Sequence, residues 1–470
     1  MILEAFTEKK ILIVGLGVSG MSLAKMFLKH KINIIAWDDD KIKRNVARKN
    51  GITLRAIDEI NFPNIDFLIL SPGIQHVGKN AHKSALLAKK NNCKIISDLE
   101  IINYINKKLF LIGITGTNGK STTTTLITHI LSNCMIDAIA CGNIGKPFSE
   151  ISFRKKKKTL VVEASSYQLE RVEKLKFDIS ILLNLSNDHL ERHVNMPNYI
   201  DAKLNIFRNQ SKKDFAIISI DDEYCREICR TYEQKYESNL IKISTEYNLD
   251  KTISIKSHND LIYIIDKYDN LEVEVNKNKL GFFGGKHNLQ NLLAAYACCK
   301  VYGIKKINFI NSLYSFKGLE HRAEKFIVFK NIIFYNDSKA TNINSSNVIL
   351  ENLSNIYWLV GGKPKHGTLK NLERNLKNVS EIFTFGEASI KFHKRLKDKV
   401  NTTPFKSLKN AINFAFKKAI IEKKPINFVL SPACSSFDEF ENFEERGSFF
   451  KQTVKRLIKE QKLNEYKKSG

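Results

Sequence analysis

The chain has 470 residues, which is too long for one compact core, so we expect about two to four domains. Its 43% hydrophobic content and 8 prolines are typical of an ordered soluble protein, and no apolar run is long enough to span a bilayer. With 75 Lys and Arg against 49 Asp and Glu the net charge is +26, but lysine is spread along the whole sequence, so nucleic-acid binding is not favoured.

Three further patterns limit the class of protein. The dense basic run RKKKK (154–158) lacks the interleaved aromatic residues of a nucleic-acid surface and is interpreted as a solvated loop. The start, MILEAFTEKK, lacks the pattern of a secretory signal, so we expect a cytoplasmic protein without membrane insertion. The 8 cysteines include no Cys-x-x-Cys pair, which indicates reduced thiols and not a zinc site. Nothing in the sequence requires more than a monomer.

The first elements expected along the chain are a strand, a glycine turn, a helix and a strand over residues 9–40, then a strand at 67–74. Gly15-x-Gly17-x-x-Gly20, followed by Asp38 after the second strand, resembles a Rossmann fingerprint, in which a helix N-terminus faces a phosphate. Taken alone, this pattern also fits an NAD-dependent dehydrogenase.

A second region begins with FLIGITGTNGKSTTTTLI (110–127), which predicts a strand, a glycine-containing loop and a helix. An ordinary Walker A motif needs glycine at the position of Ile114. Small residues still let backbone N–H groups face an anion, while Lys120 adds a charge and Ser121 can bind Mg²⁺. We therefore predict a nucleoside triphosphate site, with a plain strand-to-helix turn as the alternative.

Acidic and histidine residues follow the next strands. Glu163 ends a predicted strand and is placed like a magnesium-binding acid, although a lone acid there is more often solvated or capping. His189 and His193 are four residues apart, but Leu190 replaces the glutamate of the zinc-protease motif, so catalytic zinc is not favoured. The remaining central elements are expected as strands at 159–165, 178–186 and 214–221, antiparallel hairpins between 240 and 283, and a helix closed by Gly303.

A third region starts near residue 311 and ends in a polar helix from about residue 449. Alternating strands and helices predict three consecutive α/β domains: a Rossmann-like N-terminal domain (1–106), a central P-loop-type ATP-binding domain (107–310) and a Rossmann-like C-terminal domain (311–470). Phosphate loops on two domains favour a ligase or kinase over a dehydrogenase, which needs no triphosphate-type loop. The strands of the third domain are expected at 331–337, 356–362, 381–386 and 426–433.

Six motifs follow one another along the chain: GITGTNGKS (113–121), EASSYQLE (163–170), NLSNDHLERH (184–193), GKHNLQNLLAA (285–295), GLEHRAE (318–324) and NDSKATN (336–342). In these motifs and their order the chain resembles the Mur ligases of peptidoglycan synthesis over essentially its whole length. The stretches SPGI (71–74) and LSPACSSFDEFENFEERG (430–447) are similar to those of the members that add D-glutamate.

The resemblance implies an ATP-dependent amide ligase acting on UDP-N-acetylmuramoyl-L-alanine, D-glutamate and ATP, with an acyl-phosphate intermediate and two Mg²⁺ ions. It assigns catalytic roles to Lys120, His189 and Lys203. Ser121 and Glu163 would hold one Mg²⁺ and His189 the second, and Lys203 would face metal as a carbamate.

The resemblance also implies three sets of binding residues. The ATP set is Gly116, Thr117, Asn118, Gly119, Lys120, Ser121, Thr122, Asn288, Asn291, Arg322 and Asp337. The UDP-sugar set is Val18, Ser19, Gly73 and Asn143. The D-glutamate set is Lys339, Thr341, Lys365, Ser436 and Phe443.

Two departures from the family pattern affect these assignments. Asp38-Asp39-Asp40 stands where relatives often have Asp-Thr-Arg, so the extra acid points away from the pyrophosphate or the uridine is held differently. GGKPKHG (361–367) differs from the usual Gly-Gly-Asp-x-Lys around Lys365. The alternative functions are a ligase of the same group that adds another amino acid or extends folate, an NAD-dependent dehydrogenase, and a non-catalytic phosphate-binding regulator.

Overall fold

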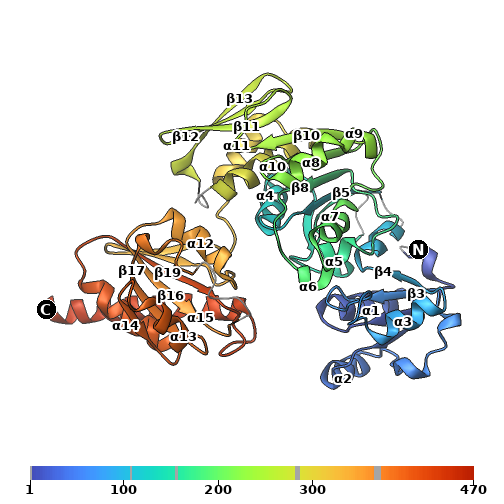
Figure 1. The fold of residues 1–470 in the computed structure, drawn as a ribbon, viewed down its shortest axis with the longest axis horizontal. Helices are drawn as coiled ribbons and strands as arrows, with labels where there is room; N and C mark the ends of the chain where they lie inside the picture. Colours follow the sequence, from blue (N-terminus) through green and yellow to red (C-terminus); the bar gives the residue numbers. More distant parts are fainter. Residues whose placement is uncertain (1–2, 106–107, 154–156, 281–285, 365–371, 470) are drawn as a thin grey trace. The chain divides into compact units, whose positions relative to one another are not determined.

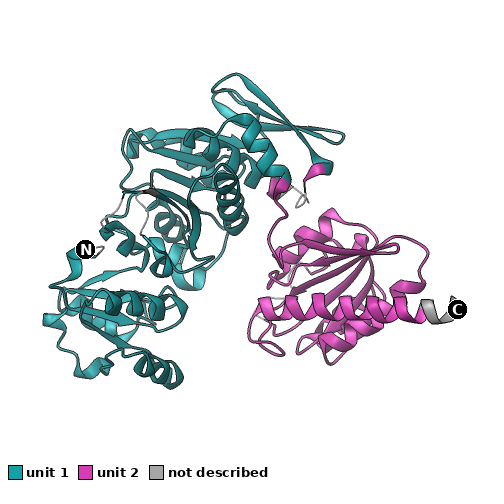
Figure 2. Ribbon diagram, turned by 180° about the vertical axis from the view of Figure 1, so that it is seen from behind, with its two compact units in different colours: residues 1–278, 289–314 teal, residues 279–288, 315–470 magenta. Residues whose placement is uncertain are grey.

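The structure, a computed structural model, describes residues 3–105, 108–153, 157–280, 286–364 and 372–469. The chain forms two compact units, one of residues 1–278 and 289–314 and the other of residues 279–288 and 315–470 (Figure 2). Among the described residues, the strands form three sheets, and one sheet lies within each of the three predicted domain ranges (Figure 1). The predicted limit at residue 310 falls inside helix α11 (Lys306–Ser315).

The first sheet has the strand order β2-β1-β3-β4 and is parallel throughout, as in a Rossmann-like domain. All four residues of β1 are buried, because helices cover both faces of a parallel sheet. The elements are β1 (Ile11–Val14), α1 (Val18–Lys29), β2 (Ile34–Trp37), α2 (Lys41–Lys49), β3 (Phe67–Leu70), α3 (Lys83–Lys90) and β4 (Lys94–Ile96).

The second sheet has nine strands in the order β13-β12-β11-β10-β9-β8-β5-β7-β6. Strands β5 to β11 are parallel, whereas β11, β12 and β13 pair antiparallel, which confirms the hairpins predicted between 240 and 283. The strands are β5 (Lys108–Thr115), β6 (Ala138–Gly142), β7 (Lys157–Glu163), β8 (Ile179–Leu182), β9 (Phe215–Ser219), β10 (Asn239–Ser244), β11 (Thr252–His258), β12 (Leu261–Asp266) and β13 (Leu271–Asn276).

Helices connect most of the parallel strands of this sheet, and further helices follow its last strand, β13. Gly303, at φ 95°, follows the long helix α10, as expected for a glycine at a helix end. The helices are α4 (Lys120–Asn133), α5 (Ser166–Leu169), α6 (Leu190–His193), α7 (Met196–Leu204), α8 (Glu223–Arg230), α9 (Tyr232–Lys235), α10 (Lys286–Tyr302) and α11.

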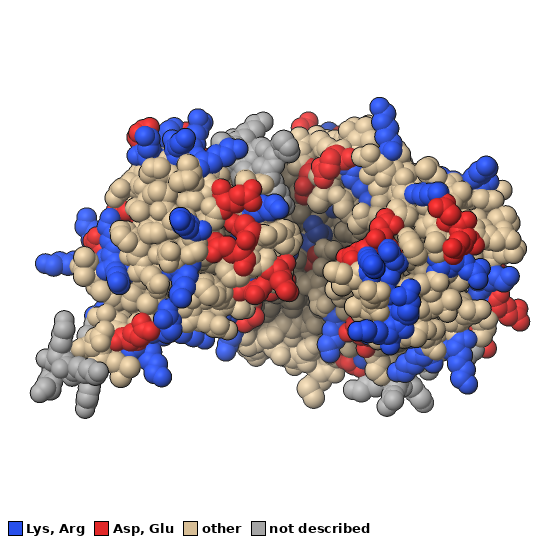
Figure 3. Space-filling view, turned by 90° about the horizontal axis from the view of Figure 1, so that it is seen from below, with Lys and Arg blue, Asp and Glu red and all other residues tan. Residues whose placement is uncertain are grey.

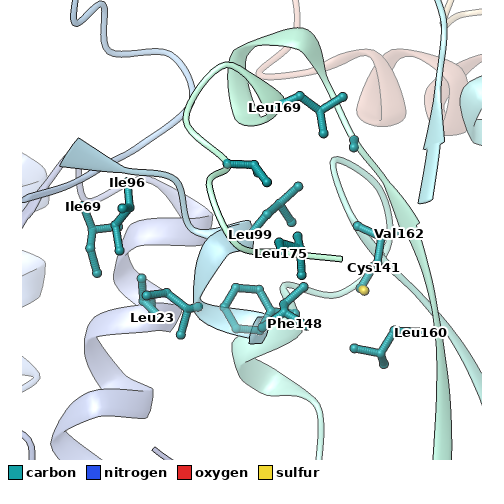
Figure 4. Packing of buried hydrophobic residues seen from close by; sticks show 14 of the residues in the cluster. Leu23, Ile69, Ile96, Leu99, Cys141, Phe148, Leu160, Val162, Leu169 and Leu175 are labelled. Carbon is teal, nitrogen blue, oxygen red and sulfur yellow. The ribbon is translucent and has the colours of Figure 1, made fainter. Parts of the chain in front are cut away.

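The first two sheets share one hydrophobic core, which explains why they form a single unit. Leu23 and Ile69 from the first sheet's layers belong to the same buried cluster as Phe148 and Val162 from the second (Figure 4). The fully buried carboxylate of Glu100 strengthens this junction, because it accepts backbone N–H bonds of 2.9, 3.0 and 3.2 Å from residues 173, 174 and 175.

The third sheet has the order β14-β15-β19-β16-β17-β18 and is parallel except for β14. Helix α15 begins at Phe443, earlier than predicted, because Asn442 caps it by accepting the Glu445 N–H at 2.7 Å. The elements are β14 (Glu324–Phe329), β15 (Ile332–Asn336), α12 (Ile343–Asn352), β16 (Ile356–Gly361), β17 (Val379–Phe385), α13 (Ser389–Leu396), β18 (Thr402–Pro404), α14 (Leu408–Ile421), β19 (Ile426–Ala433) and α15 (Phe443–Ser469).

The surface carries both signs of charge. On the face shown in Figure 3, Lys and Arg side chains are interspersed with Asp and Glu, in keeping with the spread of lysine along the sequence. None of the helices that the structure describes has the length and apolar content needed to cross a membrane.

Candidate active site

Three neighbouring strands of the second sheet place the candidate catalytic residues at one edge. Strand β5 lies between β7 and β8, and all three are parallel, so their carboxyl ends meet. The 116–119 loop follows β5, Glu163 ends β7, and the segment 184–189 follows β8. The strands that follow β5 in the sequence lie on both sides of it in the sheet: β7 and β6 on one side and β8 on the other. Ligands of open α/β sheets bind at such a switch point.

The 116–119 loop has a backbone that glycine makes possible. Gly116 and Gly119 have φ of 150° and 86°, and Gly119 is the residue before helix α4. A Cβ atom at Gly119 would lie 2.3 Å from Oδ1 of Asn291, so this position has no room for a side chain. Lys120 starts the helix and Ser121, in its first turn, is buried. The positive end of the helix dipole therefore lies at this loop, where it favours an anion.

Two residues that sequence reasoning had not assigned hold this loop. The Thr117 and Asn118 N–H groups both donate to Asn184, one to its carbonyl oxygen and one to Oδ1, each at 2.8 Å. The Thr117 hydroxyl lies 3.1 Å from the hydroxyl of Tyr199. Asn184 is the first residue of NLSNDHLERH (184–193) and follows a predicted strand, the one sequence feature that indicates a place at the sheet's carboxyl end.

The Lys120 ammonium group lies against the loop. Its Nζ donates to the carbonyl oxygens of Gly116 at 2.7 Å and Thr117 at 2.8 Å. Asn291, another predicted ATP residue, accepts a hydrogen bond of 3.1 Å from Thr123 in the first turns of α4. The structure therefore brings Lys120, the loop and Asn291 together.

Glu163 has a buried carboxylate of which only one oxygen accepts a hydrogen bond in the described structure. Oε1 accepts from the Asn143 side chain at 2.8 Å, whereas Oε2 is buried without a hydrogen-bond partner in the described structure. A buried carboxylate oxygen in that condition is costly unless a cation pairs with it. This donor fits a magnesium ion, which binds through one or two carboxylates together with substrate phosphates.

His189 is suited to a metal by its contact with Tyr167. Its Nδ1 lies 2.9 Å from the Tyr167 hydroxyl, whose pKa burial raises to about 12. A metal ligand would use Nε2, in the ring tautomer that carries its proton on Nδ1, beside that hydroxyl. In the described part of the chain, no group of three or more His, Cys, Asp and Glu side chains could hold a metal ion, so substrate oxygens would have to complete a magnesium site.

Lys203, on α7, is a buried lysine beside the same loop. It is 2% exposed, its Nζ donates to the Gly116 carbonyl oxygen at 2.8 Å, and it lies 4.7 Å from the centre of the Tyr199 ring. Burial, together with the positive charge of Lys120, holds the pKa of this amine well below its usual range. Composition alone would have assigned this residue to the surface.

The glycine turn of the first sheet is closely packed. A Cβ atom on Gly20 would lie 1.9 Å from the carbonyl oxygen of Gly15, and the Ser71 hydroxyl donates to that same oxygen at 2.8 Å. Asp38 accepts the Leu16 N–H at 2.6 Å, so this acid braces the turn from within the protein.

The two following acids have protein partners of their own. Asp39 accepts from the indole N–H of Trp37 at 3.1 Å and pairs with His82 at 3.2 Å. Asp40 caps helix α2 by accepting the Ile42 N–H at 2.7 Å. Local structure thus accounts for the acids that replace the family's usual residues.

In the second unit, one buried arginine joins the two segments that carry the predicted D-glutamate residues. Arg446 is fully buried and donates to Ser338 Oγ at 3.0 Å and O at 2.8 Å, and to the Cys434 carbonyl oxygen at 3.1 Å. The Lys339 ammonium group lies 3.8 Å from the centre of the Phe443 ring. Arg446 lies in the stretch LSPACSSFDEFENFEERG (430–447), but sequence alone does not show which arginine is buried.

Asp337 follows β15 in the same unit and is buried. Its Oδ1 accepts the Ala323 N–H at 3.0 Å and its Oδ2 accepts the Ser431 hydroxyl at 2.7 Å. Burial raises the pKa of this carboxyl from 3.8 to about 7, although these bonds and the charges of Arg322 and Arg446 oppose the rise.

We expect Asp337→Asn to stabilise the protein at about pH 8 relative to about pH 5, by about 1–3 kcal/mol. The folded state binds a proton more tightly than the unfolded state, so the stability that this group contributes below pH 3.8 is lost as the pH rises to about 7. Melting temperatures of the variant and wild type at both pH values measure the difference. Asp266→Asn is the control, because Asp266 is fully buried but paired with Lys300 at 2.6 Å, and its loss should destabilise. If Asp337→Asn changed the free energy of unfolding equally at both pH values, the raised pKa of Asp337 would be contradicted.

Two family models match this chain: the Mur ligase MurD-like N-terminal domain over residues 9–97 and the Mur ligase middle domain over residues 114–299. The chain is also 36% identical over 465 residues to the UDP-N-acetylmuramoylalanine–D-glutamate ligase of Rickettsia felis, covering 97% of this chain and 99% of that protein. This chain belongs to the Mur ligase family. A ligase of the same name from Paramagnetospirillum magneticum is 34% identical over 447 residues, covering 95% of this Mur ligase and 96% of its own length.

Solved structures of Mur ligases have the same fold as this Mur ligase. The UDP-N-acetylmuramate-alanine ligase MurC of Thermotoga maritima matches with a TM-score of 0.58 at 17% identity, covering 95% of this chain and 99% of that chain. MurF of Acinetobacter baumannii matches with a TM-score of 0.60 at 16% identity, covering 91% and 90%. The similarity confirms the predicted multi-domain α/β architecture.

The predicted site residues of this Mur ligase fall in both units. Lys365 lies outside the described residues. The first unit holds Val18, Ser19, Gly73, Gly116, Thr117, Asn118, Gly119, Lys120, Ser121, Thr122, Asn143, Glu163, His189, Lys203 and Asn291, and the second holds Asn288, Arg322, Asp337, Lys339, Thr341, Ser436 and Phe443.

Proposed function

We propose that this Mur ligase joins the amine of D-glutamate to the L-alanine carboxylate of UDP-N-acetylmuramoyl-L-alanine, with cleavage of ATP to ADP and phosphate. The observation that carries the proposal is its similarity, over 97% of its length, to a D-glutamate ligase. Mur ligases are ATP-dependent, and the loop before α4 supplies the phosphate cradle that such a reaction needs.

The reaction would proceed in two steps. The L-alanine carboxylate attacks the γ-phosphorus of ATP, the bond to ADP breaks, and an acyl phosphate forms. The amine of D-glutamate then attacks the acyl carbon, phosphate leaves, and the amine gives up a proton as the amide forms. A carboxylate is a poor acyl donor, which is why a triphosphate must be consumed.

Residues at the strand ends of β5, β7 and β8 would serve the first step. The N-terminus of α4 and the Lys120 ammonium group would bind the phosphates, and Lys120 would stabilise the negative charge that develops on the transferring phosphoryl group. Two Mg²⁺ ions, which would lower the charge on the phosphates when bound, fit Ser121 and Glu163 for one ion and His189 with carbamylated Lys203 for the other. The unpartnered Oε2 of Glu163 supports this assignment.

The other residue sets would bind the remaining groups. We assign the UDP-sugar to Val18, Ser19, Gly73 and Asn143, and the adenosine part of ATP to Asn288, Asn291, Arg322 and Asp337. D-Glutamate is assigned to Lys339, Thr341, Lys365, Ser436 and Phe443, where lysine ammonium groups would pair with its carboxylates. We further propose that the protein acts as a cytoplasmic monomer in three domains, 1–106, 107–310 and 311–470.

A phosphate-release assay tests the proposed function. With UDP-N-acetylmuramoyl-L-alanine, ATP and magnesium, D-glutamate should release phosphate at least about a hundredfold faster than L-glutamate, since the site must aim one amine at the acyl carbon. Mass spectrometry should show a new amide in the same reaction. Equal rates with both enantiomers, or release that needs no amino acid, would contradict the proposal.

A further inference from the structure

A buried glutamine connects the phosphate-binding loop to strand β9 of the same sheet. Gln290, on α10, is 7% exposed and uses both ends of its amide. Its Oε1 accepts from Asn184 Nδ2 at 2.7 Å, and its Nε2 donates to Ser219 Oγ at 2.7 Å. Ser219 is the fully buried last residue of β9, so the chain of bonds ends on a rigid strand.

The direction of these bonds follows from one backbone group. The Asn118 N–H can only donate, so the side-chain atom of Asn184 that faces it at 2.8 Å must be Oδ1. Nδ2 of Asn184 then donates both to the Asn118 carbonyl oxygen at 3.2 Å and to Gln290. Gln290 consequently presents Nε2 to Ser219.

The loop needs such support because of its composition. Gly116 and Gly119 give it the positive φ angles that the cradle requires, but glycine also allows many other conformations. Asn184 bonds to the peptide groups of Thr117 and Asn118 between the two glycines. A loop already held in its binding conformation loses less entropy when ATP binds, and this raises affinity.

We propose that Gln290 and Asn184 are positioning residues for ATP: they hold the 116–119 loop in its phosphate-binding conformation without touching a phosphate. The inference rests on the proposed function of this loop as the ATP site. The same helix contributes Asn291, which bonds to Thr123 in α4, so α10 supports both the loop and the helix that follows it.

Gln290→Met tests the proposal, because methionine keeps the length of the side chain and removes both hydrogen bonds. We expect MgATP to bind about five- to tenfold more weakly, measured by calorimetry and as the KM for ATP. The KM values for D-glutamate and for the sugar-peptide should stay within about twofold of wild type. Ser219→Ala, a smaller change at the far end of the chain of bonds, should weaken MgATP binding by a lesser factor.

Gln210→Met is the matched control. Gln210 is 8% exposed, donates to the carbonyl oxygens of Phe177 and Phe215 at 3.1 and 2.9 Å, and accepts from Ser238. Phe215 begins β9, whereas Ser219 ends it, so the two glutamines support opposite ends of one strand. The control should lower the melting temperature and leave MgATP affinity unchanged.

Two results would overturn the proposal: unchanged MgATP affinity in Gln290→Met, or an equal loss of affinity in Gln290→Met and Gln210→Met. Because the calorimetric readout does not depend on ligation, it separates this inference from the proposed function. Wild-type protein that binds no MgATP would overturn both. If wild-type protein binds MgATP but forms no amide, the substrate assignment is wrong, and the comparison of the variants still decides the role of Gln290.

Discussion

Lys120→Met should strongly reduce the rate of ligation while leaving the protein folded. Lys120 Nζ lies against the carbonyl oxygens of Gly116 and Thr117, at the start of helix α4. Removing a cation from the place where charge develops on a transferring phosphoryl group is expected to lower kcat by about two to three orders of magnitude. Methionine keeps the aliphatic part of the side chain, so the melting temperature should change little.

Single-turnover measurement of acyl-phosphate formation tests this expectation directly. Lys158→Met is the matched control, since Lys158 is 7% exposed and pairs with Asp137 at 2.8 Å in the earlier part of β7. That variant should be less stable and should ligate at the wild-type rate. Undiminished ligation by Lys120→Met would remove this residue from the mechanism.

Lys203→Met should also remove most ligase activity, but it should raise stability or leave it unchanged. Lys203 is 2% exposed, so water does not hydrate its ammonium form. This burial and the positive charge of Lys120 lower the pKa of the amine. Methionine fills a similar volume without a charge, and the Tyr199 ring already borders the site. Loss of a metal-facing carbamate is expected to cost at least about a hundredfold in kcat. Steady-state kinetics and thermal melts on the same samples separate the two effects.

The depressed pKa of Lys203 also predicts a dependence on carbon dioxide. A carbamate forms when a neutral amine attacks CO₂ and loses a proton, and a lowered pKa keeps more of the amine neutral at a given pH. Ligase activity should therefore fall in CO₂-free buffer and return when bicarbonate is added. The loss in CO₂-free buffer should be faster at lower pH, because less of the Lys203 amine is then neutral. Wild-type activity that is indifferent to bicarbonate would count against the carbamate.

The same shift has a definite sign for stability. The unfolded chain binds a proton at this lysine more tightly than the folded chain, so lowering the pH from about 10.5 favours unfolding through this group. Lys203→Met should lack that part of the pH dependence. A variant that is less stable than wild type at every pH would contradict this account.

Much of the fold followed from local patterns in the sequence. The glycine loop before Lys120, the strand ending at Glu163 and the strand entering NLSNDHLERH appear where they were predicted, because short buried strands and glycine turns leave strong local signals. The antiparallel strands after residue 251 were also predicted, since β11, β12 and β13 alternate with polar turns. The start of α15 was placed too late, because its cap at Asn442 precedes the apolar pattern that marks a helix.

The roles of several charged residues could not be inferred in this way. Asp39 and Asp40 looked like unfavourable neighbours of a pyrophosphate, yet one bonds to Trp37 and His82 and the other caps α2. Arg446 and Gln290 had no distinguishing local pattern at all. Their partners lie far away in the sequence, and a hydrogen bond between distant residues leaves no periodic trace in either segment.

The amino-acid sequence by itself determined the α/β class, the phosphate loop and the family, because each of these depends on residues that are close together or occur in a set order. The tertiary structure decided which side chains are buried and what they meet: the unpartnered oxygen of Glu163, the depressed pKa of Lys203 and the bonds from Gln290 to the loop. Burial and hydrogen bonding arise only when β5, β7, β8 and β9 and helix α10 come together, so the chemistry of these side chains depends on the packed sheet.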